Sequence, residues 1–224
     1  MSSIRHALLF GATGLVGSHL LEQALADGNL HVTAVTRRAL PLHHERLTNL
    51  LVSDFAQLDT QPAPAGIDLA FSCLGTTLKQ AGGKAGFHAV DHDLVLRCAG
   101  WAQRGGVRHF LTVSAMGADE RSPVYYNRVK AETERDLIAL GFAQLTIFQP
   151  SLLLGEREGP FRPAEALALK LSPLFSPLMI GPLAPYTPVL GRDVARAMLR
   201  RALQAPATVP VERLRWKEIR ALAG

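Results

Sequence analysis

Short apolar runs alternate with amphipathic stretches of helical length along most of this 224-residue chain. The runs are partly β-branched and have the length of buried strands, whereas the stretches between them repeat their apolar residues with a helical period. This alternation predicts βαβ units, because parallel neighbouring strands need a long crossover, usually a helix, between them. We therefore expect an α/β fold with a doubly wound parallel sheet, the Rossmann fold, in one domain over residues 1–224.

The positions of these runs set the expected order of the elements. Strands are expected at residues 6–10, 31–36, 49–53, 67–73, 107–114, 144–148 and 211–216, and helices at 15–26, 87–104, 124–140 and 192–203. Residues 151–190 differ from the rest because they are rich in Pro and Gly. The segment after the last core strand of such a fold commonly covers the ligand crevice, so 151–190 is the candidate substrate lid.

Composition narrows the class of protein and of partner. The formal net charge is +5, but the basic residues are scattered, which predicts a generic basic surface and no nucleic acid as the main partner. Cys73 and Cys98 form neither a disulfide framework nor a metal-ligand set, so no metal site is expected. Glycines interrupt the first apolar run, and no run reaches the ~18 apolar residues of a membrane span. We expect a cytoplasmic protein with a small-molecule substrate and no membrane partner, and homodimer formation stays open.

The segment LLFGATGLVG at residues 8–17 is an apolar strand followed at once by Gly11, Gly14, Gly17 and a helix. Glycines at this spacing allow a sharp turn, a close approach of the backbone to a pyrophosphate, and close packing of the helix on the strand. The N–H groups and the dipole at the helix N-terminus then hold the anion. The spacing alone is a weak signal, but its position favours a dinucleotide site over a plain Gly-rich turn.

Two arginines follow the second expected strand, where an NAD-specific site carries an acidic residue. A carboxylate accepts a hydrogen bond from the adenosine ribose 2′-OH, whereas guanidinium groups pair with a 2′-phosphate. Arg37 and Arg38 therefore predict NADP as the cofactor, with NADPH preferred over NADH, unless both are solvated loop residues. Asp54, after the third strand, is expected to face the adenine. The end of the fourth strand is expected near the ribose, at Cys73, Leu74, Gly75 and Thr76.

A candidate catalytic set lies further along the chain. Ser114 ends the strand HFLTVS, and Tyr126 and Lys130 follow in YYNRVK. Tyr126 and Lys130 are i and i+4 on the expected helix, so they share one face, whereas Tyr125 points off it. A phenol is a poor base at neutral pH, and an adjacent ammonium favours the phenolate. Tyr126 is therefore expected to exchange the proton, Ser114 to hydrogen-bond the substrate oxygen, and Lys130 also to contact the nicotinamide ribose.

The segments GATGLVG, CLGTT, VDHDLVLRCA, HFLTVSAMGAD, YNRVKAETE and FQPSLLLGER occur in this order. Together they resemble the atypical short-chain dehydrogenase/reductases near the NmrA-like branch, in the group related to the Tat-interacting oxidoreductase. The resemblance covers residues 4–203 and implies a Rossmann fold and the triad Ser114, Tyr126 and Lys130. It implies NADPH binding through Gly11, Thr13, Gly14, Leu15, Val16, Arg37 and Arg38, with Pro150, Ser151, Leu152 and Leu153 beside the nicotinamide. Orthodox members add an Asn from the helix before the Ser-bearing strand, and the nearest position here is Asp91.

The leading hypothesis is an NADPH-dependent oxidoreductase acting on a small carbonyl, an enone or a similar apolar substrate. The alternatives are a non-catalytic NADPH-responsive binding protein and an epimerase or isomerase that uses NAD(P) transiently. The complete triad favours an enzyme over a sensor, and the short region after Pro150 leaves little to hold a nucleotide sugar. The Gly-rich loop at residues 77–86 is expected to order over the cofactor, with Lys79 or Lys84 reaching its phosphates, unless it is an inert surface loop.

Overall fold

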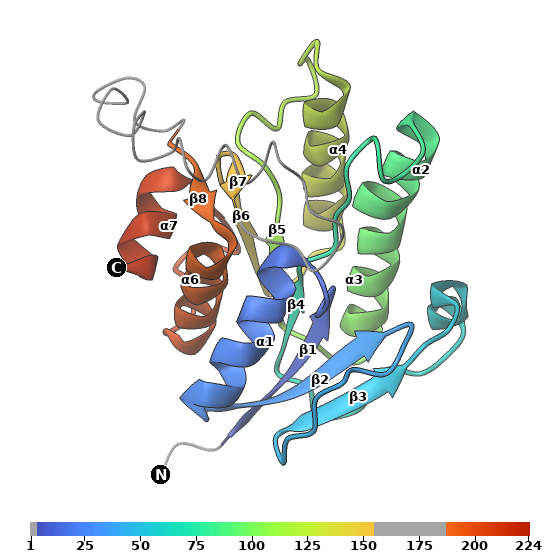
Figure 1. Ribbon diagram of the computed structural model, residues 1–224, viewed down its shortest axis with the longest axis vertical. Coiled ribbons are helices and arrows are strands. Elements are labelled where there is room, and N and C mark those ends of the chain that lie inside the picture. Colours follow the sequence, from blue (N-terminus) through green and yellow to red (C-terminus); the bar gives the residue numbers. More distant parts are fainter. Residues whose placement is uncertain (1–3, 155–186) are drawn as a thin grey trace.

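A computed structural model describes residues 4–154 and 187–224. Their main feature is a seven-stranded parallel sheet with the strand order β3-β2-β1-β4-β5-β6-β9 (Figure 1). The strands are β1 Arg5–Phe10, β2 Leu30–Thr36, β3 Leu47–Leu51, β4 Leu69–Ser72, β5 His109–Val113, β6 Gln144–Phe148 and β9 Val211–Leu214. The chain runs outward from β1 to β3 and then crosses back to β4, beside β1, so the sheet is doubly wound. The prediction of a Rossmann-type α/β fold is confirmed.

Helices cover both faces of this sheet (Figure 1). One face carries α1 Leu15–Asp27, α6 Gly191–Leu203 and α7 Trp216–Ala223, and the other carries η1 Phe55–Asp59, α3 Val95–Arg104 and α4 Tyr125–Ala139. Strand β1 shows why both faces of the sheet are apolar. Leu9 packs into the hydrophobic core on the α1 side, whereas Leu8 and Phe10 pack into the core on the α3 side. Alternate side chains of a strand point to opposite faces, so a central strand covered on both sides is apolar throughout.

The expected helix at 87–104 begins earlier and is not uniform. A short helix α2 (Lys84–His88) leads into a π-helical turn η2 (Ala89–Leu94), which runs directly into α3. A π-helical turn holds one more residue than an α-helical turn and is frequent at functional sites. Two polar residues of η2, Asp91 and His92, are buried.

The third strand also differs from its expected position. It was expected at residues 49–53, whereas β3 spans Leu47–Leu51. Beyond the strand, the Val52 N–H still donates to the Thr36 carbonyl at 2.9 Å, and the Asp54 side chain then accepts a hydrogen bond from the Ala56 N–H at 2.9 Å and caps η1. A local side-chain cap of this kind competes with strand pairing.

The expected substrate lid lies mostly outside the described residues, which omit 155–186. Its two described ends meet, because β7 (Leu153–Leu154) pairs with β8 (Val189–Leu190) and the Ser151 hydroxyl donates to the Thr187 carbonyl at 2.6 Å. The lid itself stays a prediction. Among the described residues, no helix is both long and apolar enough to cross a bilayer.

Candidate functional site

The Gly-rich turn joins β1 to α1 at the centre of the sheet. Gly11 has φ of 82°, and a Cβ there would lie 2.8 Å from the backbone carbonyl of Cys73 at the end of β4. A Cβ on Gly17 would lie 2.0 Å from the Gly11 carbonyl oxygen. Both positions therefore require glycine, the first for a left-handed backbone between two strands and the second for close packing of α1 on the turn.

The N-terminus of α1 is open to an anion. Gly14 is its N-cap, its N–H donates to the Gly11 carbonyl at 3.0 Å, and no side chain among the described residues caps the helix. The first N–H groups of a helix and its dipole favour a negative charge at this end. The turn lies where the strand order reverses between β1 and β4, which is where α/β sheets bind their ligands. These residues fit the diphosphate of a dinucleotide.

Replacing Gly17 with Ala is expected to disrupt this turn. The new methyl group meets a backbone oxygen that cannot rotate away, so the turn or α1 must shift, at about 1–3 kcal/mol. Thermal unfolding should show a lower melting temperature, and calorimetry should show at least a tenfold loss of dinucleotide affinity. Gly100→Ala is the matched control, because a Cβ there lies 3.7 Å from Arg104 and has room. Equal affinity in Gly17→Ala and wild type would contradict the assignment.

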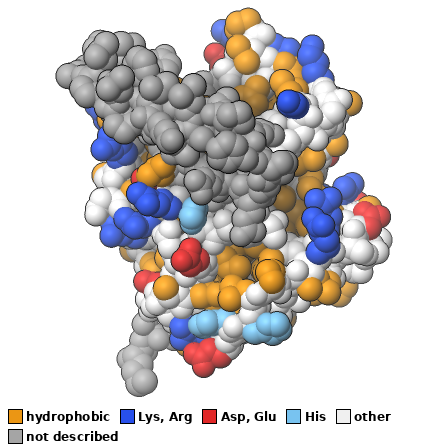
Figure 2. Space-filling model, in the orientation of Figure 1, with side chains coloured by type: hydrophobic (Ala, Val, Ile, Leu, Met, Phe, Trp, Pro, Cys, Tyr) orange, Lys and Arg blue, Asp and Glu red, His pale blue; other side chains and the backbone are white. Residues whose placement is uncertain are grey.

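The two arginines after β2 lie at the surface of the described part of the chain. Arg37 and Arg38 are exposed, and neither guanidinium has a partner within residues 4–154 and 187–224. The bend that presents them is ordered, because the Thr36 hydroxyl donates to the Arg38 carbonyl at 2.7 Å and accepts from Asn49 at 2.7 Å. On the face in view, Lys and Arg side chains gather in separate groups (Figure 2). The geometry leaves both guanidinium groups available to a ligand.

Helix α4 brings Tyr126 and Lys130 together as expected. The Lys130 Nζ lies 5.9 Å from the centre of the Tyr126 ring, and the ring packs on Phe87 with centroids 5.3 Å apart. Tyr125 turns away, and its hydroxyl donates to the Lys84 carbonyl at 3.1 Å. Tyr126 is thus the phenol that faces the lysine.

Lys130 forms a buried ion pair with Asp91 that the sequence alone did not reveal. The Nζ lies 2.8 Å from Asp91 Oδ1, with the side chains 7% and 1% exposed. Asp91 Oδ2 accepts from the Thr76 N–H at 2.8 Å, and the Thr133 hydroxyl donates to the Asp91 carbonyl at 3.0 Å. Burial lowers the pKa of Lys130, but Asp91, Tyr126 and Glu134 together raise it more, and the pKa lies above its ordinary value. Lys130 is therefore a fixed ammonium.

The Ser114 hydroxyl points into a different network. It donates to Glu134 Oε1 at 2.6 Å, and the same oxygen accepts from the Gln149 amide at 2.8 Å. The other oxygen of Glu134 pairs with Arg213 at 3.0 Å. Glu134 follows Lys130 by four residues, so the helical spacing that selected Tyr126 and Lys130 also points to it. Ser114 lies beside α4 as predicted, but its hydroxyl is occupied, and its contact with a substrate stays a prediction.

The remaining candidate residues line the carboxyl edge of the sheet. Asp54 uses one carboxylate oxygen to cap η1, and the Pro150 carbonyl accepts from Met116 N–H at 2.8 Å, which places the loop after β6 beside the loop after β5. Leu152 is 64% exposed. Lys84 Nζ lies 5.3 Å from the centre of the Tyr125 ring. The predicted contacts of these residues with the cofactor stay predictions.

Comparison with known proteins defines the family. The NAD(P)H-binding family model matches residues 11–165, which include the Gly-rich turn, Tyr126 and Lys130. HTATIP2 of Rattus norvegicus is 38% identical over 220 residues, with 96% of this chain and 88% of that protein aligned. FMP52 of Eremothecium gossypii, named as mitochondrial, is 40% identical over 154 residues, 68% of each chain.

Solved structures share the fold at lower identity. MoeE5 in complex with UDP-glucose and NAD has a TM-score of 0.66 at 18% identity, covering 93% of this chain and 75% of that one. WbmF of Bordetella bronchiseptica, in complex with NAD+, has a TM-score of 0.67 at 16% identity, covering 99% and 77%. At these identities the likeness shows the Rossmann-type fold and nothing of the substrate.

One expectation is corrected by the relatives. FMP52 of Eremothecium gossypii and FMP52 of Kluyveromyces lactis, 33% identical over 222 residues, are both named as mitochondrial proteins. The expectation of a cytoplasmic location is therefore wrong. It rested on the lack of an export signal and of a membrane span, and neither feature distinguishes between compartments inside the cell.

Sequence, fold and site agree on the class of ligand. The matched region contains the glycine turn, the N-terminus of α1 and the pair of Tyr126 and Lys130. The fold is shared with proteins whose structures were solved with NAD bound. The chain belongs to the NAD(P)H-binding family of atypical short-chain dehydrogenase/reductases that includes HTATIP2 and FMP52.

Proposed function

We propose that this protein is an NADPH-dependent oxidoreductase that reduces a small carbonyl compound or a similar apolar substrate, with Tyr126 as the proton donor. The observation that carries the proposal is the placement of a phenol and a buried ammonium on one face of α4, 5.9 Å from ring centre to Nζ. Membership of an NAD(P)H-binding family supports the dinucleotide, and the exposed guanidinium groups of Arg37 and Arg38 support NADPH over NADH.

The residues of the chain divide the work between binding and proton transfer. NADPH supplies the hydride when it is bound. The glycine turn and the N-terminus of α1 hold its diphosphate. The Tyr126 hydroxyl donates its proton to the substrate oxygen, and the Lys130 ammonium stabilises the phenolate that remains. Asp91 keeps Lys130 charged and fixes its position, at the cost of cancelling part of its field.

The test of this proposal is chemical. The purified protein should carry or bind NADPH, identified by mass, and should oxidise it in the presence of a compound from a panel of carbonyls and enones. The loss of NADPH absorbance gives the rate, and chromatography gives the reduced product. Reduced product with NADPH and not with buffer alone is the expected result. A substrate that the protein converts without NADPH would contradict the proposal.

A second candidate function is an NADPH-responsive binding protein without turnover. The observation that favours it is the Ser114 hydroxyl, which is bonded to Glu134 at 2.6 Å instead of facing a substrate. Such a protein would have a different affinity for its partner when NADPH is bound than when NADP+ is bound. It would not oxidise NADPH with any compound of the panel. Binding of a captured partner that follows the redox state of the dinucleotide, without product formation, would favour this candidate over the enzyme.

Asp91→Asn is expected to move the alkaline side of the pH profile. Burial lowers the pKa of Lys130, and Asp91, Tyr126 and Glu134 raise it. An amide at position 91 removes one of the groups that raise this pKa, so Lys130 should lose its proton at lower pH. The rate should then fall at lower pH than in wild type. Removing one partner of a buried pair should also cost about 3–5 kcal/mol of stability at neutral pH.

The control for this prediction is Asp59→Asn, which removes a carboxylate from an exposed ion pair with Arg97 at 3.1 Å. That change should leave both the pH profile and the melting temperature near the wild-type values. An Asp91→Asn variant that folds and keeps the wild-type pH profile would show that Asp91 does not hold Lys130 in its charged form.

A further inference from the structure

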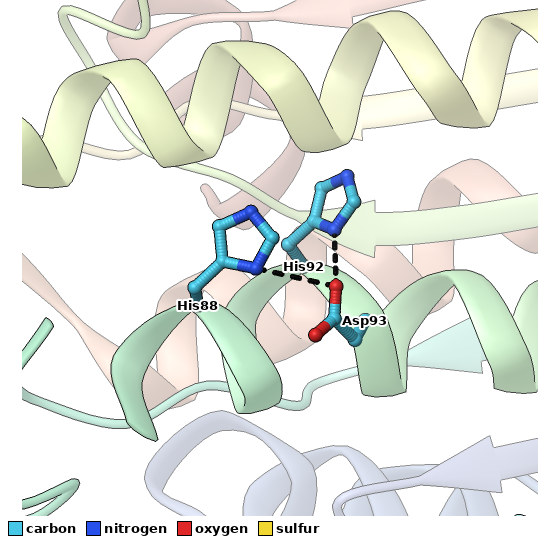
Figure 3. Close-up of side chains that lie close together, drawn as sticks. All are labelled: His88, His92 and Asp93. Atoms are coloured by element: carbon cyan, nitrogen blue, oxygen red, sulfur yellow. Dashed lines mark hydrogen bonds and ion pairs between the residues drawn. The ribbon is translucent and has the colours of Figure 1, made fainter. Parts of the chain in front are cut away.

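Two histidines and an aspartate converge in the helical turns that lead into α3. His88 ends α2, and His92 and Asp93 lie on η2 (Figure 3). Asp93 Oδ1 lies 2.7 Å from His92 Nδ1 and 3.2 Å from His88 Nδ1, and the ring centroids are 4.4 Å apart. All three ligand atoms lie within 4.8 Å of one another. The π-helical turn produces this convergence by changing the helical spacing between its residues.

The outer nitrogens of both rings also face carboxylates. His92 Nε2 lies 3.0 Å from Asp136 Oδ2, and His88 Nε2 lies 3.4 Å from Glu132 Oε2. A neutral imidazole has one N–H and one lone pair, so each ring can satisfy only one of its two carboxylates. Among the described residues, each neutral ring thus leaves one carboxylate contact unsatisfied, and either two extra protons or one divalent cation would satisfy both contacts.

We propose that this cluster binds a divalent transition-metal ion through His88 Nδ1, His92 Nδ1 and Asp93 Oδ1. In this arrangement each Nε2–H donates to its outer carboxylate, Glu132 for His88 and Asp136 for His92. That is the carboxylate–histidine–metal pattern that fixes the tautomer and orientation of metal-bound imidazoles. The same five side chains thus have their hydrogen-bonding groups satisfied without any extra proton.

The donor set selects the class of metal. Two imidazole nitrogens and one carboxylate oxygen suit Zn²⁺ and its neighbours Ni²⁺ and Cu²⁺, whereas Mg²⁺ and Ca²⁺ prefer oxygen ligands. Tetrahedral ligands at about 2.0–2.2 Å from Zn²⁺ are roughly 3.4 Å apart. The Asp93 Oδ1 atom lies 2.7 and 3.2 Å from the two Nδ1 atoms, so these two contacts need to open by less than about 1 Å. The Asp93 side chain is 52% exposed, which gives solvent access and leaves a position for water.

The site would join two parts of the molecule that carry the proposed function. Asp91, the partner of Lys130, lies on η2 between the metal ligands, and Glu132 and Asp136 lie on α4 with Tyr126 and Lys130. Arg135 pairs with both of these carboxylates, because its Nε lies 2.7 Å from Asp136 Oδ1 and its Nη2 lies 3.8 Å from Glu132 Oε1. A bound ion would therefore stabilise the contact between η2 and α4, whether or not the protein is an enzyme.

The test uses the untagged full chain, treated with chelator and titrated with ZnCl₂ by calorimetry. One Zn²⁺ per chain is expected, with a rise in melting temperature. His88→Gln and Asp93→Asn should each weaken the binding at least tenfold, and both replace partly exposed side chains, so folding should persist. His19→Gln, which alters a histidine on the exposed part of α1, should bind as wild type does.

Two results would overturn the proposal. One is the absence of saturable Zn²⁺ binding by the folded wild-type chain. The other is Zn²⁺ binding of equal strength in wild type, His88→Gln and Asp93→Asn, which would place the ion elsewhere. Neither result bears on NADPH oxidation, so the proposal stands or falls apart from the proposed function.

Discussion

Replacing Tyr126 with Phe is expected to lower the turnover of NADPH by about two orders of magnitude or more, the scale of losing a general acid. The change removes only the hydroxyl, so the ring should keep its packing on Phe87, 5.3 Å between centroids, and its place beside Lys130. NADPH affinity should therefore stay within a small factor of wild type. Steady-state rates with an identified substrate and calorimetry with NADPH measure the two effects separately.

Tyr125→Phe is the matched control, because it removes the neighbouring hydroxyl, which donates to the Lys84 carbonyl at 3.1 Å. Its turnover should remain near that of wild type. Lys130→Ala, by contrast, should weaken both turnover and NADPH binding, since Lys130 is expected to contact the ribose as well. Equal turnover of a confirmed substrate by wild type and Tyr126→Phe would refute the assigned proton donor and leave the fold untouched.

The double variant Arg37→Ala, Arg38→Ala is expected to lose NADPH affinity while keeping NADH affinity. A charge-assisted hydrogen bond contributes roughly 1.5–3 kcal/mol, so two good contacts to a 2′-phosphate amount to a loss of at least about a hundredfold. Both side chains are exposed and lack partners in the described part of the chain, so their removal should not affect folding. Calorimetry with NADPH and NADH in the same buffer gives the ratio of the two affinities.

Arg108→Ala, Lys217→Ala serves as the control, because it removes two positive charges from exposed positions elsewhere. It should change the affinities for NADPH and NADH little and equally. A wild-type protein that binds both dinucleotides with the same affinity, and a double arginine variant that does so too, would show that Arg37 and Arg38 are solvated loop residues.

The fold could be predicted from the sequence because its signals are local and repeated. Each of the strands β1, β2 and β6 is an apolar run bounded by turn residues, and its residues are buried on both faces of the sheet. Boundaries were less certain where a side chain decides them. The cap of η1 by Asp54, shortly after β3, was missed because a cap depends on local hydrogen bonds and not on periodicity.

Within the candidate site, the sequence predicted the contact that spacing on one helix fixes and missed the contacts that the tertiary structure fixes. The pairing of Tyr126 with Lys130 follows from the four-residue spacing on a helix. The Asp91 to Lys130 ion pair joins residues far apart in sequence and depends on the π-helical turn. The hydrogen bond that the Ser114 hydroxyl donates to Glu134 depends on how α4 packs against β5. Long-range pairs of this kind leave no periodic signal in one sequence.

Transfer of deuterium from NADPH in which both hydrogens of the reactive nicotinamide carbon are deuterium tests the central claim most directly. The labelled cofactor is incubated with the protein and a mixture of small carbonyl compounds, and the molecular masses of the products are measured by mass spectrometry. We expect the wild type and Tyr125→Phe to form a reduced product that carries the deuterium. Tyr126→Phe should form this product at least about a hundredfold more slowly. Products without deuterium, or labelled product formed equally fast by Tyr126→Phe, would contradict it.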